Sequence, residues 1–217
     1  MFISVAVVVA VSATLQQPEM RFVRWEQEVR GIEKRLAKAS PTVGGVLFVG
    51  SSSIRLWDTA KAFPDLPTAN VGFGGSEVRD CTHFVPRLVT PHKPKTIVFY
   101  AGDNDTANGR TAEQVRDDFA AFVTAVRKPL PDCRVLFVAI KPSPKRWKLF
   151  DVQTKANSLV KAWAASQTAV GVIDVVTPAL GADGKPKPEL FVKDELHLSA
   201  AGYEIWKAAV KNALGGR

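Results

Sequence analysis

Short and nearly continuous apolar runs, separated by helical segments, constrain the fold of this chain more than any other feature. Four runs rich in Val, Ile and Phe have the length of strands, namely 46–49, 96–100, 135–140 and 170–175. Continuous rather than alternating apolar character is typical of strands covered on both faces, as in a parallel sheet between helices. We expect a further short strand over 69–73.

Segments with apolar residues at helical spacing lie between these strands, at about 77–89, 112–126, 150–166 and 200–214. Another helix is expected over 18–39, where Phe22, Trp25 and Val29 fall on one stripe. This alternation predicts an α/β fold, a three-layer α/β/α sandwich with a central parallel sheet. In such folds function concentrates in loops beyond the carboxyl ends of the strands.

The N-terminal stretch, residues 1–13, is apolar and ends in Val-Ser-Ala, which resembles a signal-peptidase site. It has no Lys or Arg, and it is shorter than the roughly 20 residues that span a bilayer. We expect residues 1–13 to be a secretion signal of a secreted or periplasmic protein, 14–44 a helix and lead-in, and 45–217 the main domain. The alternative is that this stretch is a buried first strand of a cytoplasmic protein. A mature N-terminus near Thr14 would decide in favour of the secretion signal.

The net charge of +8 raises the question of nucleic-acid binding, but basic residues alternate with acidic ones, as in Arg24, Glu26, Glu28 and Arg30. This mixture indicates a solvated helix face, and no nucleic-acid reading module is evident. Cys81 and Cys133 are the only cysteines and lack the C-x-x-C spacing of a zinc site. Whether they pair is open, because a disulfide needs Cα atoms within about 7 Å.

Three serines, Ser51, Ser52 and Ser53, follow Gly50 directly after the first strand and lead into a short helix. A serine at a helix N-terminus has unpaired backbone N–H groups and a partial positive charge beside it, which suits a nucleophile. The alternative is that these serines only cap the helix.

Two further blocks follow the next strands. The glycine-rich segment 70–76 allows the Gly75 N–H to approach a ligand, or it is simply a tight turn, and its spacing is not that of a dinucleotide-binding loop. In 102–105, the side-chain amide of Asn104 could donate to a developing negative oxygen. A calcium loop is excluded because Ala107 and Gln114 stand where ligands are needed, so no metal is implied.

Near the C-terminus, Asp194 and His197 precede the last helix. His83 lies in a helical segment and His92 among prolines and lysines, so His197 is the candidate general base. A carboxylate on its other ring nitrogen, from Asp194, would fix the tautomer. The alternative is a helix cap with an incidental histidine.

Together these four blocks resemble the SGNH hydrolases, or GDSL-like lipases and esterases. The resemblance covers about 46–206 and implies a flavodoxin-like fold, with Ser52 as nucleophile, Asp194 and His197 as its partners, and the oxyanion-hole donors Ser52, Gly75 and Asn104. It departs from the family at Ser51, where Gly-Asp-Ser is common, so the choice of Ser52 depends on the register of Gly50. The G-x-S-x-G elbow of α/β-hydrolases is absent because Ile54 replaces its last glycine.

The substrate is less evident from sequence. The loop after the fourth strand carries Lys145, Arg146 and Trp147, which predicts an anionic or sugar-like substrate, or else a solvated loop with Trp147 packed inward. The resemblance implies a serine esterase that needs no cofactor and takes a small-molecule or glycan ester, with removal of an acetyl group from a carbohydrate as the first expectation. A lysophospholipase or thioesterase, and a non-catalytic glycan-binding protein on the same fold, are the alternatives.

Overall fold

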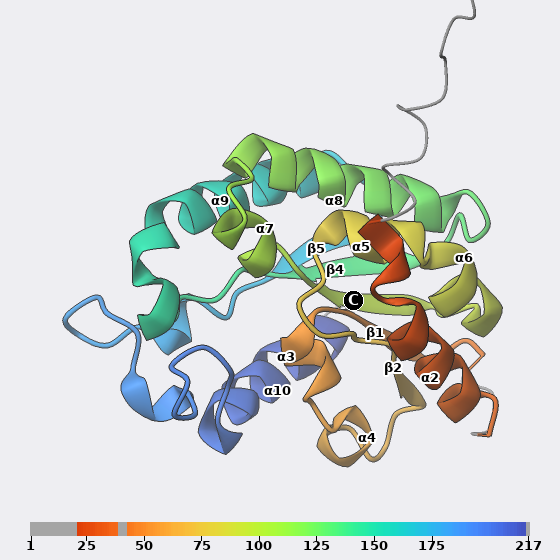
Figure 1. Cartoon of the computed structure of the whole chain (residues 1–217), viewed down its shortest axis with the longest axis horizontal. Coiled ribbons are helices and arrows are strands. Elements are labelled where there is room, and N and C mark those ends of the chain that lie inside the picture. Colours follow the sequence, from red (N-terminus) through yellow and green to blue (C-terminus); the bar gives the residue numbers. More distant parts are fainter. Residues whose placement is uncertain (1–20, 39–42, 216–217) are drawn as a thin grey trace, which may run out of the picture.

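The computed structural model describes residues 21–38 and 43–215 and contains a parallel five-stranded sheet between two layers of helices (Figure 1). The strand order is β2-β1-β3-β4-β5. The strands are β1 Val46–Gly50, β2 Thr68–Asn70, β3 Thr96–Tyr100, β4 Arg134–Val138 and β5 Val170–Ile173. The predicted α/β/α sandwich is therefore confirmed.

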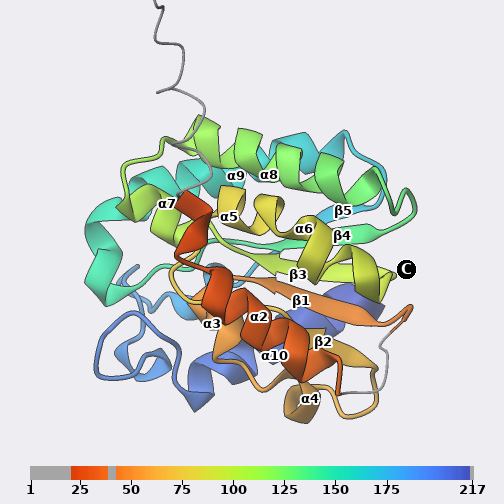
Figure 2. The same cartoon turned by 45° about the vertical axis from the view of Figure 1, so that its right-hand side comes forward.

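Helices cover both faces of the sheet, as the turned view also shows (Figure 2). One layer contains α2 Glu26–Leu36, α5 Val78–His83, α6 Val85–Leu88, α8 Ala112–Arg127 and α9 Phe150–Ala165. The other contains α3 Ser52–Arg55, α4 Thr59–Ala62 and α10 Ala200–Gly215. The short α7 Asp103–Ala107 follows β3, and the 3-10 helix η2 Pro144–Leu149 precedes α9.

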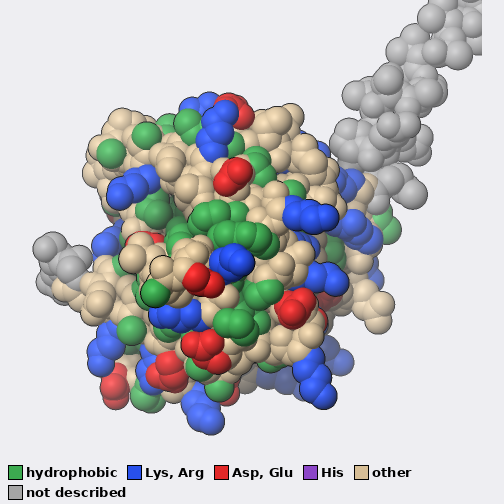
Figure 3. All heavy atoms as spheres, turned by 90° about the vertical axis from the view of Figure 1, so that its left-hand side faces the viewer, with side chains coloured by type: hydrophobic (Ala, Val, Ile, Leu, Met, Phe, Trp, Pro, Cys, Tyr) green, Lys and Arg blue, Asp and Glu red, His purple; other side chains and the backbone are tan. Residues whose placement is uncertain are grey.

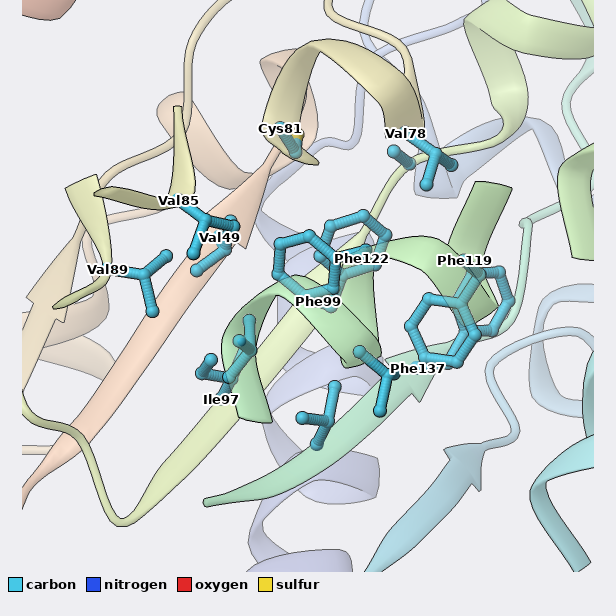
Figure 4. Close-up of a cluster of buried hydrophobic side chains, with 14 of the residues drawn as sticks. Val49, Val78, Cys81, Val85, Val89, Ile97, Phe99, Phe119, Phe122 and Phe137 are labelled. Carbon is cyan, nitrogen blue, oxygen red and sulfur yellow. The ribbon is translucent and has the colours of Figure 1, made fainter. Parts of the chain in front are cut away.

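Alternate residues of each strand enter opposite cores. In β1, Leu47 and Val49 pack under the α8 layer, whereas Phe48 packs under the α10 layer. The α8 side is rich in aromatic rings, with Phe99 and Phe122 at a centroid distance of 4.3 Å (Figure 4). Burial on both faces explains why the sequence of each strand is a continuous apolar run.

Several boundaries differ from the sequence prediction for identifiable reasons. The expected helix 77–89 is divided into α5 and α6, because Pro86 lies in the first turn of α6, a position that suits an imino acid. The strand expected over 69–73 ends at Asn70, although Val71 and Phe73 still donate backbone hydrogen bonds to β1.

Gly50 closes β1 and directs the chain toward the serines. Its φ is +148°, and a Cβ there would lie 1.9 Å from the Tyr100 carbonyl oxygen of β3. The Ser51 N–H donates to that same carbonyl at 2.9 Å. Only glycine allows this close approach of two strands, so Gly50 fixes where the serine turn leaves the sheet.

Both cysteines of the described chain are buried free thiols, so they do not pair. Burial raises the pKa of the Cys133 thiol to about 11. The predicted secretion signal, residues 1–13, lies outside the described residues. Among the helices that are described, none has the length and apolar character needed to cross a membrane.

Candidate active site

The predicted site residues converge at the carboxyl edge of the sheet. Ser52 begins α3 after β1, Gly75 lies in the loop after β2, Asn104 belongs to α7 after β3, and His197 precedes α10. This edge is the left side of Figure 1 and faces the viewer in Figure 3, where acidic and basic side chains are intermixed. Residues distant in sequence therefore share one surface of the molecule.

Ser52, His197 and Asp194 form a continuous hydrogen-bonded chain. The His197 Nε2 atom lies 2.9 Å from the Ser52 Oγ, and the His197 Nδ1 atom lies 2.5 Å from an Asp194 carboxylate oxygen. Because a carboxylate only accepts, Nδ1 carries the proton and Nε2 is left to accept the hydrogen of the Ser52 hydroxyl. The predicted nucleophile, base and orienting carboxylate are thus brought together in the arrangement that serine hydrolysis requires.

The Asp194 carboxylate is held rigidly and stays ionised. Its other oxygen accepts backbone N–H groups from Leu196 and His197, both at 2.9 Å. Desolvation opposes ionisation, but hydrogen bonds from the His197 side chain and from the two backbone N–H groups outweigh it and lower the Asp194 pKa to about 2. Asp194 is therefore a carboxylate at neutral pH.

The three serines differ in exposure and contacts. Ser51 and Ser53 are only 2% and 3% exposed, whereas Ser52 is partly exposed and contacts His197. The Tyr203 hydroxyl donates to the Ser53 carbonyl oxygen at 2.9 Å, which ties α10 to the serine turn. Of the alternatives that the sequence left open, Ser52 alone has the geometry of a nucleophile.

The predicted oxyanion donors belong to three segments at this edge of the sheet, α3, the loop after β2 and α7. As the first residue of α3, Ser52 has no intrahelical partner for its N–H. Within the described residues, the N–H of Gly75, which has a φ of +70°, also has no protein acceptor. One hydrogen of the Asn104 Nδ2 donates to the Ser76 carbonyl oxygen at 3.0 Å, which leaves the second hydrogen for a ligand.

Helix α2 supports the glycine loop, which sequence reasoning did not foresee. Glu28 accepts the Gly74 N–H at 3.0 Å, and the Trp25 ring would lie 3.4 Å from a Cβ at Gly75. Helical spacing placed Trp25 on the apolar stripe of this helix, but it gave no indication of the partner. The N-terminal helix therefore fixes the backbone that presents the Gly75 N–H.

The loop carrying Lys145, Arg146 and Trp147 has mixed contacts. Lys145 is exposed, and its backbone N–H donates to the Glu195 carbonyl oxygen at 3.1 Å, in the loop that carries His197. Trp147 stacks on Phe150 with ring centroids 4.5 Å apart. Arg146 points inward, toward α7, instead of standing free in solvent. Binding of substrate by this loop stays a prediction.

A buried charge cluster lies beneath α7 and was not identified from the sequence. Asp103 contacts Lys141 at 3.2 Å, Arg146 at 2.7 Å and Gln153 at 3.1 Å. Burial opposes ionisation of Asp103, but the two cations hold its pKa below the usual value. The one available signal in the sequence is a lysine, Lys141, close behind the buried strand β4. No group of His, Cys, Asp and Glu that could hold a metal occurs among the described residues.

A serine, a histidine and a carboxylate linked by hydrogen bonds at the carboxyl edge of a parallel sheet form the arrangement of a serine hydrolase. The chain matches the model of the GDSL-like Lipase/Acylhydrolase family over residues 54–205, and it belongs to this family. The matched region contains Gly75, Asn104, Asp194 and His197 and begins just after Ser52. The protein is thus a serine ester hydrolase, as the sequence resemblance implied.

One curated protein and two solved structures illustrate what this chain is similar to. The chain is 29% identical over 168 residues to the platelet-activating factor acetylhydrolase IB subunit alpha1 of Rattus norvegicus, covering 73% of this chain and 69% of the rat protein. A GDSL-like lipase from Bacteroides thetaiotaomicron superposes with a TM-score of 0.70 at 21% identity, covering 89% of this chain and 96% of the lipase. A carbohydrate esterase family 3 protein from Talaromyces cellulolyticus gives a TM-score of 0.62 at 17% identity, covering 78% and 95%. These two structures share the fold of this chain.

Proposed function

We propose that the protein removes a short acyl group, an acetyl group in the first instance, from a carbohydrate or similar alcohol through an acyl-enzyme on Ser52. The observation that carries this proposal is the chain of hydrogen bonds from Ser52 through His197 to Asp194 at an open sheet edge. His197 accepts the proton as the Ser52 oxygen attacks the ester carbonyl. Asp194 stabilises the imidazolium that forms.

The same residues complete both halves of the reaction. His197 returns its proton to the leaving alcohol, and the acyl group remains on the Ser52 oxygen. Water then attacks the acyl-enzyme with His197 again as base, and the acid is released. The N–H groups of Ser52 and Gly75 and the Asn104 amide donate to the oxyanion at each tetrahedral stage, and the reaction needs no cofactor.

Replacing Asn104 with alanine is expected to lower kcat for p-nitrophenyl acetate by about 10²- to 10³-fold, because one oxyanion donor is lost. The variant should keep its fold, since the backbone of α7 is unaffected and the Asn104 side chain is partly exposed. Steady-state kinetics measure the effect, and Asn212→Ala, at an exposed position near the end of α10, serves as the control. Turnover of Asn104→Ala equal to that of the wild type would contradict the assigned role.

Polar surroundings of the site support a short acyl group and a hydrophilic alcohol. Glu28, Arg55 and Arg146 lie around the glycine loop and Asn104, an unfavourable setting for a long alkyl chain. The names of the rat and Talaromyces relatives, an acetylhydrolase and a carbohydrate esterase, agree with this choice.

A substrate panel tests the proposal. Wild type, Ser52→Ala and Lys145→Glu are compared on acetylated acidic polysaccharide, neutral acetylated sugar and lysophospholipid. We expect Ser52-dependent release of acetate from the sugars, and a selective loss on the acidic polymer for Lys145→Glu, because Lys145 is exposed beside the catalytic loop. Faster hydrolysis of lysophospholipid than of any acetyl ester would contradict the proposed specificity, and an unchanged ranking in Lys145→Glu would contradict its steering role.

We also propose that residues 1–13 direct export. The support is the apolar sequence ending in Val-Ser-Ala. N-terminal sequencing of the protein from its native host should find a mature end near Thr14, and an N-terminus at residue 1 or 2 would contradict export.

A further inference from the structure

Arg146 connects a buried acid with the side chain of the oxyanion donor. One guanidinium nitrogen lies 2.7 Å from an Asp103 carboxylate oxygen, and the other terminal nitrogen donates to the Asn104 Oδ1 at 3.0 Å. The Arg146 side chain is only 19% exposed. A planar guanidinium can serve both acceptors at once, which a lysine ammonium cannot do in the same geometry.

The groups behind Arg146 hold it in place. Asp103 is buried at the start of α7, where Lys141 and Gln153 also donate to its carboxylate. Lys141 is 1% exposed, and the Tyr100 hydroxyl completes the set at 3.4 Å. One carboxylate and two cations give this cluster an excess positive charge next to Asn104. Both cations of this buried set contact the carboxylate, which restricts their movement, although the Gln153 Oε1 has no hydrogen-bond partner among the described residues.

The contacts of Asn104 define which way its amide faces. Its Oδ1 accepts from Arg146, and its Nδ2 donates to the Ser76 carbonyl oxygen. If the Asn104 amide were flipped, its oxygen would face the Ser76 carbonyl oxygen and its NH₂ group would face the Arg146 guanidinium. Both contacts would then be repulsive. The remaining Nδ2 hydrogen is therefore fixed in direction, and a cationic donor on Oδ1 increases its strength as a hydrogen-bond donor.

We propose that Arg146 is a positioning residue of the reaction, which orients and polarises the Asn104 amide and so strengthens its hydrogen bond to the oxyanion. This rests on the proposed function, in which Asn104 donates to that oxyanion. Arg146 itself does not touch the substrate carbonyl in this account. Through Asn104, Arg146 stabilises the oxyanion only in the transition state. Loss of Arg146 should therefore lower kcat and leave KM nearly unchanged.

A double-mutant cycle on p-nitrophenyl acetate tests this role with wild type, Arg146→Met, Asn104→Ala and the double variant. Arg146→Met should lower kcat about 10- to 100-fold with little change in KM, since it weakens a donor rather than removing it. In the Asn104→Ala background, Arg146→Met should lower kcat by less than about threefold, because the effects of residues that act through one another are not additive. Arg146→Lys should recover part of the lost kcat.

Arg110→Met is the matched control, because the Arg110 side chain is also 19% exposed and forms an ion pair with Asp118 at 2.6 Å instead of a hydrogen bond to Asn104. Thermal unfolding of all variants separates loss of stability from loss of kcat, and Arg146→Lys replaces Arg146→Met in the cycle if the latter fails to fold. The positioning role would be overturned if the loss of kcat in the double variant equalled the product of the losses in the two single variants. Wild-type kcat in Arg146→Met would overturn it as well. An Asn104→Ala variant with wild-type kcat would instead overturn the proposed role of Asn104, and with it the basis for this inference.

Discussion

Replacing Ser52 with alanine is expected to lower kcat for p-nitrophenyl acetate by about 10⁴- to 10⁶-fold, because loss of a nucleophile removes the acyl-enzyme route altogether. The residual rate would come from the oxyanion donors and from substrate binding. Ser52 is partly exposed, and its hydroxyl contacts only His197 among the described side chains, so the fold should be retained.

The neighbouring serines provide the controls for this substitution. Ser51→Ala and Ser53→Ala remove buried hydroxyls that lie in the same turn, and each should change kcat far less than Ser52→Ala. Thermal unfolding shows whether either variant loses stability. A Ser51→Ala or Ser53→Ala variant as inactive as Ser52→Ala, but equally stable to heat, would contradict the assignment of the nucleophile.

Converting Asp194 to asparagine is expected to lower kcat by about 10⁴-fold through the tautomer of His197. The Oδ1 of the new side chain can still accept the Leu196 and His197 N–H groups, so the loop stays in place. Its NH₂ group, however, would face Nδ1 and favour the tautomer with the proton on Nε2. That nitrogen could then no longer accept the proton of Ser52.

The pH dependence and a charge-matched control strengthen the Asp194 test. Because the Asp194 pKa is lowered to about 2, the carboxylate persists as pH falls until about that value, and its protonation should not contribute to loss of activity above pH 4. Glu195→Gln removes one negative charge from the same exposed loop and should retain most of the activity. If Glu195→Gln and Asp194→Asn lost kcat equally, loop charge rather than the His197 tautomer would be the cause.

Much of the fold could be predicted because burial on both faces leaves a clear pattern in each strand. β3, Thr96–Tyr100, has the predicted bounds, and α8 and α9 end within one residue of theirs. The predicted bounds are wrong where local chemistry, rather than the spacing of apolar residues, determines the structure. Pro86 divides the helix that the spacing predicted as continuous, and α7 forms within a block that was interpreted only as a strand-end loop.

The site could be predicted only as far as its residues lie at strand ends. Parallel strands bring their carboxyl ends to one edge, so Ser52 and Asn104 could be expected to meet. His197 follows a long segment after β5, and its place at this edge was implied by the resemblance to the family. The residues that support them could not be found this way, because Glu28 and Arg146 act through contacts between segments far apart in sequence. Taken by residue type alone, Glu28 indicates only a solvated helix face and Arg146 only a basic loop.

Covalent trapping tests most directly whether Ser52 is a nucleophile activated by His197. The protein is treated with a fluorophosphonate, and the labelled peptide is fragmented by mass spectrometry to distinguish the three adjacent serines. The account predicts one adduct, on the Ser52 oxygen, that is absent in Ser52→Ala and forms far more slowly in His197→Ala. An adduct on Ser51 or Ser53, or labelling of Ser52 at the same rate without His197, would contradict it.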